Sequence, residues 1–224
     1  VFVRALAVDR PPVCLPSLGG VGPFTPSAFH KAVEAASGRS DDVRVSIVPP
    51  QLARLLADDA GIAALRACRQ VLVGGASTRD SLLDTCRELD VRVTTTYGAT
   101  ETSGGCVFDG VPLPGVTVTT AAAGNTGPGL LTIHGRCVAS GYRGEPELTR
   151  ERFAPGSFVT SDVGIVSSEG TVQVVGRADD VVIINGINVS PSAVERVIGD
   201  LPDIVSAAVV AIGDDDGDPI LVAF

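Results

Sequence analysis

The sequence has 224 residues, of which 45% are hydrophobic, and its net charge is −9 because 26 acidic residues outnumber 17 lysines and arginines. This length and composition suffice for a large hydrophobic core, and the acidic surplus argues against nucleic acid or an anionic membrane as the main partner, since both are polyanions. No apolar run approaches the roughly 20 residues of a membrane-spanning helix. We therefore expect a globular, cytoplasmic protein that binds small molecules or another protein.

The first hundred residues alternate between strand-like and helical patterns. Thr25 followed by Pro26 predicts a capped helix that extends to about Ala36. The other predicted elements are strands at 43–48, 71–73 and 91–96, helices at 51–57 and 62–68, and a helix capped by Ser77. Strands that alternate with helices at this spacing predict right-handed crossovers and a parallel sheet.

Beyond Cys106 the pattern changes to short β-rich pieces interrupted by glycine and proline. It predicts a β subdomain, either a distorted barrel or a meander, in which His134 has a structural rather than a catalytic role. The five scattered cysteines include no C-x-x-C pair. They favour reduced, mostly buried thiols over a disulfide framework or a zinc site.

The last region begins at Arg177 and predicts a small α+β domain. A buried strand is expected at 181–184, and a further strand at 205–212. Between them, Ser190 and Pro191 predict the start of a helix that buries Val194, Val197 and Ile198. The acidic turn 214–218 lacks the regular ligand spacing of a calcium loop and is expected to be a solvated hairpin turn. We expect domain boundaries that separate 1–105, 106–176 and 177–224.

Two successive strands end in glycine-rich or polar loops, Gly74-Gly75-Ala76-Ser77 and Tyr97-Gly98-Ala99-Thr100-Glu101. The carboxyl ends of parallel strands are where open α/β sheets bind ligands. The second loop offers a ring that can stack on a base, a backbone without a side chain, a hydroxyl for phosphate and a carboxylate for a metal ion. Taken alone, it could equally be a strand exit with incidental polar residues.

The order of five motifs resembles that of the adenylate-forming superfamily, which contains acyl- and aryl-CoA ligases, nonribosomal adenylation domains and luciferase. The motifs are Gly74-Gly75-Ala76, Tyr97 to Glu101, Gly141-Tyr142, Thr160-Ser161-Asp162, and Gly176 to Asp180 followed by Gly186 and Pro191 to Glu195. The resemblance implies a large domain built on a parallel α/β sheet with a β subdomain, a hinge and a small C-terminal α+β domain. The whole fold is thus a combination of α/β and α+β parts.

The resemblance also implies a binding site for ATP or AMP and Mg²⁺. Gly74, Gly75 and Ala76 would line the adenine site, with Tyr97 stacked on the base and Gly98 leaving the backbone open beside it. Thr100 would contact the α-phosphate and Glu101 would hold the metal ion, and these two residues are the catalytic candidates. Asp162 would bind the ribose hydroxyls, and Arg177 would add a hydrogen-bond donor there.

By the same resemblance, Asp179 is the hinge about which the C-terminal domain rotates between two reactions, and Gly186 lies beside the channel for the pantetheine arm of CoA. Asp179 and Asp180 would also suit a capped turn between strands. In the implied reactions, ATP converts a carboxylic acid to an acyl-adenylate, and the thiol of CoA then displaces AMP. The expected partners are therefore a small carboxylic acid, ATP and CoA.

The sequence also departs from the family pattern. The phosphate loop that ends in lysine and the C-terminal catalytic lysine are both missing, Ser161 replaces a usual glycine, and Leu130 replaces a frequent glutamate. The sequence contains no methionine and begins and ends within apolar runs. We therefore expect it to be a fragment of a longer protein.

Within the superfamily, 48–56 and 95–113 resemble the 2-succinylbenzoate–CoA ligases of menaquinone biosynthesis. Gly104 and Gly105 would leave space for the aromatic acyl group, although they would also suit a flexible turn. Three other hypotheses stay open: another acyl- or aryl-CoA ligase, an amino-acid adenylation domain, and a non-catalytic nucleotide-binding relative.

Overall fold

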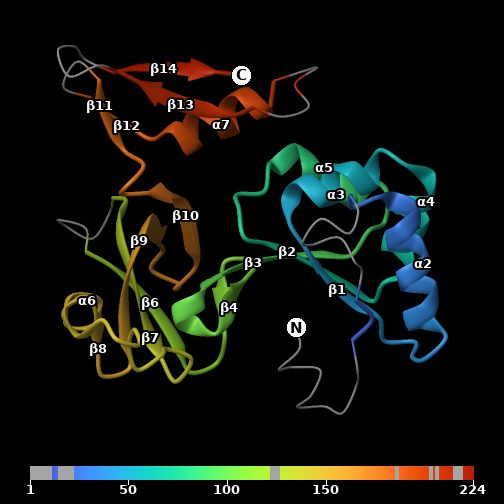
Figure 1. The fold of residues 1–224 in the computed structure, drawn as a ribbon, viewed down its shortest axis with the longest axis horizontal. Coiled ribbons are helices and arrows are strands. Elements are labelled where there is room, and N and C mark those ends of the chain that lie inside the picture. Colours follow the sequence, from blue (N-terminus) through green and yellow to red (C-terminus); the bar gives the residue numbers. More distant parts are fainter. Residues whose placement is uncertain are drawn as a thin grey trace. The chain divides into compact units, whose positions relative to one another are not determined.

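The computed structural model describes residues 12–14, 23–121, 127–184, 187–201, 204, 207–213 and 219–224. The chain divides into two compact units, Val1–Thr95 and Thr96–Phe224, whose elements are labelled in Figure 1. Among the described helices, none has both the length and the apolar character needed to cross a membrane.

The first unit contains alternating strands and helices, as expected. Its elements are α2 (Pro26–Ser37), β1 (Arg44–Ile47), α3 (Pro49–Leu56), α4 (Asp59–Ala67), β2 (Gln70–Gly74), α5 (Asp80–Glu88) and the first residues of β3 (Val93–Ala99). β1 and β2 pair in parallel, with Val45 opposite Val71 and Ile47 opposite Val73. This pairing confirms the predicted parallel arrangement.

Local capping chemistry explains where most of these helices begin. The Thr25 hydroxyl accepts a hydrogen bond from the Ala28 N–H at 3.2 Å, which confirms the predicted cap of α2. Pro49 and Pro50, expected to precede a helix, instead form the first turn of α3, a position where proline loses no helical hydrogen bond. The predicted cap at Ser77 is wrong. The chain stays non-helical through Arg79, and α5 begins at Asp80.

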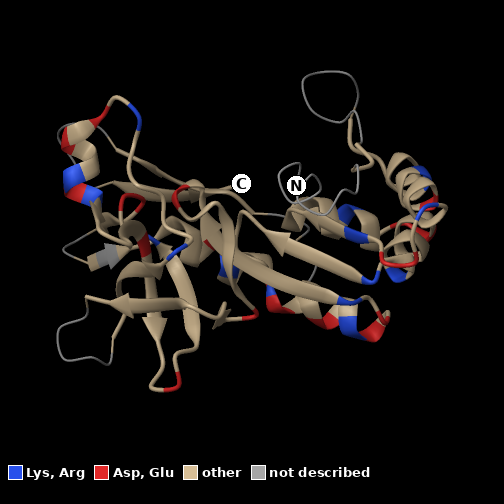
Figure 2. Ribbon diagram, turned by 90° about the horizontal axis from the view of Figure 1, so that it is seen from below, with Lys and Arg blue, Asp and Glu red and all other residues tan. Residues whose placement is uncertain are grey.

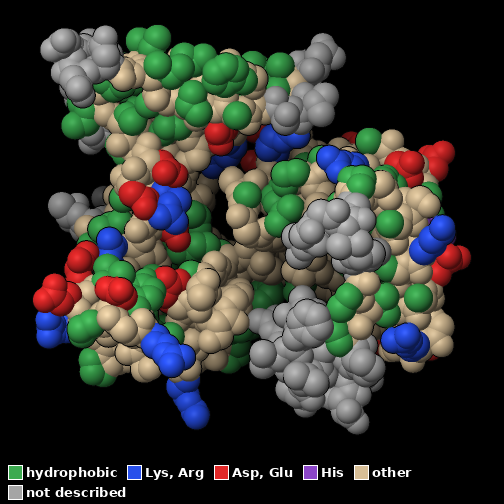
Figure 3. Space-filling view, viewed as in Figure 1, with side chains coloured by type: hydrophobic (Ala, Val, Ile, Leu, Met, Phe, Trp, Pro, Cys, Tyr) green, Lys and Arg blue, Asp and Glu red, His purple; other side chains and the backbone are tan. Residues whose placement is uncertain are grey.

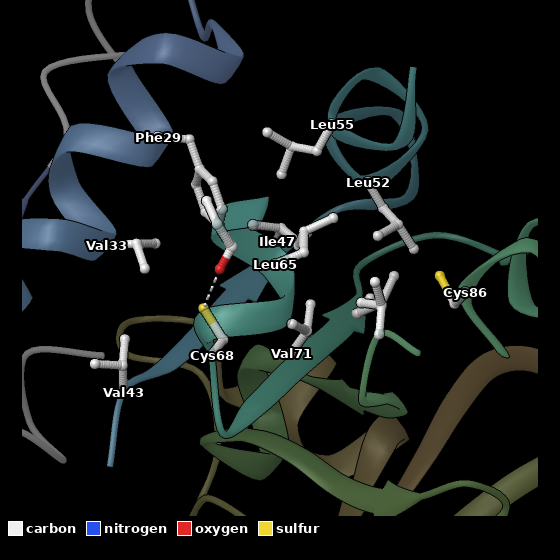
Figure 4. Packing of buried hydrophobic residues seen from close by; sticks show 13 residues of the cluster. Phe29, Val33, Val43, Ile47, Leu52, Leu55, Leu65, Cys68, Val71 and Cys86 are labelled. Atoms are coloured by element: carbon white, nitrogen blue, oxygen red, sulfur yellow. Dashed lines mark hydrogen bonds between the residues drawn. The ribbon is translucent and has the colours of Figure 1, made fainter. Parts of the chain in front are cut away.

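The core of the first unit lies between the helices and the sheet (Figure 4). Leu52, Leu55 and Leu65 have no solvent-exposed surface, and burial of such a side chain contributes about 2 kcal/mol to stability. Cys68 is equally buried, and its thiol donates a hydrogen bond to the Ala64 carbonyl oxygen at 3.3 Å. The i, i+3 spacing of Leu52 and Leu55 on α3 therefore marks the face of the helix that contacts the core.

The cysteines of the described part are free thiols. Burial raises the pKa of Cys68 and of Cys86 to about 11 in each case, so both are protonated and unreactive near neutral pH. At pH 8, we expect an aromatic disulfide reagent to modify exposed Cys14 first and to reach Cys68, Cys86 and Cys106 only after denaturation. Mass spectrometry of the modified peptides measures the order. The variant Cys14→Ser should lose the fast phase, and rapid modification of Cys68 in the folded protein would contradict this prediction.

The second unit is rich in strands. After β3 come the 3₁₀ turn η1 (Thr100–Thr102), β4 (Gly104–Phe108), β5 (Val111–Pro112), β6 (Val116–Thr120), β7 (Gly129–Gly135), α6 (Pro146–Arg152), β8 (Phe153–Ala154), β9 (Ser157–Val166) and β10 (Val172–Arg177). β4 and β5 extend the first sheet, which has the order β1-β2-β3-β4-β5. The second sheet is antiparallel with the order β10-β9-β7-β6. This order matches the meander predicted for the β-rich region.

The buried side chains of the second unit centre on Cys106, Val118, Leu131 and Ile133. His134 lies on β7, and its Nε2 is 3.0 Å from the hydroxyl oxygen of Thr119 on the neighbouring strand. This hydrogen bond fits the structural role expected for His134.

The C-terminal elements form two small hairpins and a helix. They are β11 (Val182–Ile184), β12 (Ile187–Val189), α7 (Pro191–Gly199), β13 (Val209–Ile212) and β14 (Ile220–Ala223). The Ser190 cap of α7 is confirmed by a hydrogen bond to its hydroxyl from the Ala193 N–H at 3.4 Å. The predicted burial of Val197 and Ile183 is wrong, since these residues are 64% and 60% exposed. Val194, Ile198 and the other two residues of β11 are only half-buried. Each hairpin has only two strands, so apolar side chains stay on the surface (Figure 3).

Charged side chains of both signs are interspersed on the helices and turns (Figure 2). Exposed pairs such as Arg44 with Asp42, at 2.9 Å, and Arg150 with Glu147, at 3.8 Å, contribute little to stability. The two hydrophobic clusters therefore stabilise the fold far more than the ion pairs do. The acidic turn 214–218 lies outside the described residues, and the domain boundaries expected after 105 and 176 stay predictions.

Candidate functional site

The Tyr97–Glu101 motif lies on β3 and the 3₁₀ turn that follows it. β3 extends to Ala99, so Tyr97 and Gly98 are strand residues and not part of a loop. The turn is fixed by Thr102, which is 2% exposed. Its hydroxyl accepts a hydrogen bond from the Ala99 N–H at 2.9 Å and donates one to the Gly104 carbonyl at 2.8 Å. Sequence reasoning did not identify Thr102, because its two partners belong to the backbone.

Gly98 allows β3 and β4 to approach each other closely. A Cβ atom at this position would lie 2.2 Å from the Gly104 carbonyl oxygen and 2.8 Å from the Gly105 Cα. The strand register also shifts between Tyr97 and Gly98, as at a β-bulge. A packing requirement therefore explains this glycine, in addition to the open backbone that was predicted for it.

Tyr97 and Asp162 are hydrogen-bonded to each other. The tyrosine hydroxyl donates to Asp162 Oδ2 at 2.7 Å. Burial, the hydrogen bond and the negative charge of Asp162 raise the pKa of Tyr97 well above its usual value, so the phenol stays a proton donor at physiological pH. An ionised carboxylate can accept about four hydrogen bonds, and Asp162 therefore retains acceptor capacity for a ligand.

A buried threonine fixes the backbone of Asp162 on β9. Thr160 is 2% exposed, and its hydroxyl donates to the Leu131 carbonyl at 2.9 Å and accepts from the Asp162 N–H at 2.9 Å. The Thr160 hydroxyl thus ties β9 to β7 at the point where the carboxylate leaves the sheet. The sequence identified Thr160 only as part of a motif, because its contact with Leu131 depends on the pairing of β9 with β7.

Arg177 lies at the end of β10 among three aspartates. Its guanidinium binds both carboxylate oxygens of Asp179, with distances of 3.0 Å and 2.5 Å, and one nitrogen is 3.8 Å from Asp162 Oδ1. The hydrogen bonds from Arg177 lower the pKa of Asp179. In this arrangement the predicted ribose donor is paired with the predicted hinge residue, and Asp180 is a weaker partner at 4.0 Å.

Glu101 forms a second polar cluster with Tyr142. The tyrosine hydroxyl donates to Glu101 Oε1 at 2.6 Å, and the Ala139 N–H donates to the Glu101 carbonyl oxygen at 2.8 Å. Burial and the hydrogen bond to Glu101 raise the pKa of Tyr142 to about 12. A shallow concavity of about 600 Å³ borders this tyrosine and is lined by Ser140–Pro146, Thr149 and Arg150.

Glu101 is suited to Mg²⁺ that arrives with a nucleotide. In the described ranges, no three His, Cys, Asp or Glu side chains are grouped so that they could hold a metal ion. Mg²⁺ usually keeps several waters and binds one or two carboxylates together with substrate phosphates. The half-buried residue Glu101, next to the exposed residue Thr100 in the chain, fits that mode of binding.

The remaining predicted residues lie in other places. Gly74 ends β2 in the first unit, and Gly75 has a φ of +81°, a conformation that favours glycine. Gly104, the first residue of β4, has a φ of +106°. A Cβ on neighbouring Gly105 would lie 3.4 Å from the Thr96 side chain and 3.5 Å from the Phe108 ring. Gly186 lies outside the described residues.

No protein-family model matches the chain. Among curated proteins, the probable 2-succinylbenzoate–CoA ligase of Mycobacterium tuberculosis is 37% identical over 219 residues, which are 96% of this chain and 54% of that protein. The 2-succinylbenzoate–CoA ligase of Listeria monocytogenes is 28% identical over 187 residues, 80% of this chain and 40% of that protein. The chain thus spans about half the length of the first of these relatives, and less of the second.

Solved structures agree with these sequence matches. The amide bond synthetase McbA of Marinactinospora thermotolerans has a TM-score of 0.76 and 26% identity, covering 90% of this chain and 44% of that one. The o-succinylbenzoate CoA synthetase MenE of Bacillus subtilis, in complex with the acyl-adenylate intermediate OSB-AMP, has a TM-score of 0.74 and 25% identity with the same coverage. The resemblance inferred from the motifs is confirmed, and the chain belongs to the adenylate-forming superfamily.

Proposed function

We propose that the whole protein is an ATP-dependent acid–thiol ligase that converts 2-succinylbenzoate to its CoA thioester, a step of menaquinone biosynthesis. The observation that carries this proposal is the 37% identity to a probable 2-succinylbenzoate–CoA ligase along 96% of the chain. The structure of B. subtilis MenE in complex with ATP and magnesium ion, which is 25% identical with a TM-score of 0.73, supports the same cofactors here.

The proposed reaction has two steps. A carboxylate oxygen of the acid attacks the α-phosphorus of ATP, the bond to the β-phosphate oxygen breaks, and pyrophosphate leaves. The CoA thiol then loses its proton and attacks the acyl carbon, and AMP leaves with the electrons of the broken C–O bond. The first step concentrates negative charge on phosphoryl oxygens, so positioned donors and cations provide most of its catalysis.

We propose that residues of the described ranges contact the nucleotide. We assign Tyr97 to the adenine face, Asp162 and Arg177 to the ribose, and Thr100 to the α-phosphate. Tyr97 and Asp162 are already joined at 2.7 Å, so base and ribose would be held by one hydrogen-bonded pair. Glu101 would hold Mg²⁺, which neutralises charge on the phosphate oxygens when bound.

The other proposed assignments rest on the family motifs. They are Gly74, Gly75, Ala76 and Gly98 at the adenine site, Gly104 and Gly105 at the acyl group, Asp179 at the hinge and Gly186 at the CoA channel. The bidentate contact of Arg177 with Asp179 supports the hinge assignment. That ion pair links the ribose side of the site to the start of the C-terminal elements. A rotation at Asp179 would therefore change both the ribose side and the position of those elements.

The test is release of AMP by the whole protein with ATP, Mg²⁺, CoA and 2-succinylbenzoate. We expect turnover with this acid at least ten times faster than with benzoate or a fatty acid. Acids without the succinyl carboxylate would leave the polar groups that bind it without a partner, which strongly disfavours them. Turnover of benzoate or a fatty acid, with no turnover of 2-succinylbenzoate, would overturn the substrate assignment. No AMP with any acid would favour a non-catalytic relative.

The acceptor of the second step needs its own control. The likeness to an amide bond synthetase, with a TM-score of 0.76, makes an amine the alternative acceptor. The same assay with a primary amine in place of CoA should give adenylate without efficient acyl transfer. Faster transfer to the amine than to CoA would assign the protein to amide synthesis.

A further inference from the structure

Gly141-Tyr142 is a motif of the sequence to which the reaction assigns no role. The structure places the Tyr142 hydroxyl 2.6 Å from Oε1 of Glu101, the carboxylate assigned to the metal ion. The two residues are 41 positions apart in the chain. This contact therefore depends on the tertiary fold, and a local turn alone would not produce it.

Tyr142 is fixed through its backbone and its ring. Its N–H donates to the Thr149 hydroxyl of α6 at 2.9 Å, and its ring packs edge-on against Phe153 with centroids 5.1 Å apart. Gly141 has a φ of +145°, and a Cβ there would lie 2.4 Å from Thr149 Cγ2. A tyrosine fixed through its backbone and its ring has few other positions available for its hydroxyl.

Glu101 is fixed through its backbone as well. It lies in η1, and its carbonyl oxygen accepts a hydrogen bond from the Ala139 N–H at 2.8 Å. Ala139 precedes Tyr142 by three residues, so one segment contacts both the backbone and the carboxylate of Glu101. Because the tyrosine hydroxyl takes one lone pair of Oε1, Oε2 is the oxygen better able to bind a metal ion.

We propose that Tyr142 is a positioning residue, which holds the Glu101 carboxylate so that its second oxygen binds the Mg²⁺ of the nucleotide. The inference rests on the proposed function, since it takes Glu101 as the metal ligand. Partners that orient a metal-binding carboxylate change metal affinity by about 10- to 100-fold when they are removed.

The test measures metal binding directly. The variant Tyr142→Phe removes the hydroxyl and keeps the ring on Phe153. The whole protein with a non-cleavable α,β-methylene analogue of ATP is titrated with Mn²⁺, and free Mn²⁺ is measured by electron paramagnetic resonance. We expect Tyr142→Phe to weaken Mn²⁺ binding about tenfold or more and to raise the Mg²⁺ concentration for half-maximal adenylation by a similar factor. Its thermal midpoint should stay close to that of the parent protein.

A double-mutant cycle separates positioning from a general structural effect. In a Glu101→Gln background, Tyr142→Phe should have little further effect on Mn²⁺ affinity, because the two residues act through one contact. The control Thr119→Val removes a hydroxyl contact that involves no tyrosine, the one with His134 at 3.0 Å, and should leave Mn²⁺ affinity unchanged.

The outcomes distinguish this inference from the proposed function. If Glu101→Gln weakens Mn²⁺ binding and Tyr142→Phe does not, the positioning role is wrong and the metal role of Glu101 stands. If Glu101→Gln leaves Mn²⁺ binding unchanged, both are overturned. Fully additive losses in the double variant would also overturn positioning, since independent effects require no shared contact.

Discussion

Replacement of Glu101 by glutamine in the whole protein is expected to lower the rate of adenylate formation by about 10²-fold or more, the loss typical when one group that stabilises transition-state charge is removed. The substitution keeps the size of the side chain and removes its negative charge. The amide oxygen can still accept the hydrogen bond from Tyr142, so the turn should stay folded. Pyrophosphate release in a single turnover measures the step.

A matched control for this prediction is Glu169→Gln. Glu169 is exposed in the turn between β9 and β10, and its substitution removes the same charge from the protein. We expect unchanged turnover for this variant, and partial recovery of Glu101→Gln at high Mg²⁺ concentration. Equal rates for Glu101→Gln and the parent protein would refute the metal role.

The contacts of Tyr97 show why the candidate nucleotide site needs two sheets. Tyr97 comes from β3 of the first sheet and Asp162 from β9 of the second, and 65 positions separate them in the chain. Their hydrogen bond fixes the edge of the aromatic ring and directs one carboxylate oxygen. The ring that would stack on the base and the carboxylate that would bind the ribose are thus ordered before any ligand arrives, which reduces the entropic cost of binding.

Local chemistry explains what could be predicted from the sequence. Thr25 and Ser190 were identified as helix caps because a hydroxyl followed by proline is itself the signal for a helix start. Ser77 carries only half of this signal, and its helix begins three residues later. The alternation of helices and strands likewise predicted the parallel pairing of β1 with β2, since right-handed crossovers permit few other arrangements.

Features that depend on distant residues could not be predicted in the same way. The sequence identified Tyr97, Glu101, Asp162 and Tyr142 by type, but their pairing depends on sheet order and register. The exposure of Val197, at 64%, shows the same limit. An apolar residue at helical spacing predicts a buried face, and whether anything covers that face depends on the elements around it.

Gly98→Ala is expected to destabilise the protein by about 3 kcal/mol, the upper range for forcing extra atoms into packed space. The new Cβ would lie 2.2 Å from the carbonyl oxygen of Gly104 and 2.8 Å from its carbonyl carbon. These atoms belong to the backbone, so no side chain can rotate away. Relief requires β3 and β4 to separate where Gly98 pairs with Gly105 and Ala99 pairs with Gly104. The midpoint of urea-induced unfolding measures the loss.

The control Gly38→Ala places the same methyl group where there is room. Gly38 caps α2 with a φ of −66°, and its added Cβ would be 3.7 Å from the nearest atom. Its effect on stability should stay within about 0.5 kcal/mol. The pair of variants also separates two roles of Gly98. If this glycine served only to admit the nucleotide, Gly98→Ala would weaken nucleotide binding and leave the urea midpoint unchanged. The close approach of the two strands instead predicts that stability falls in the absence of any ligand.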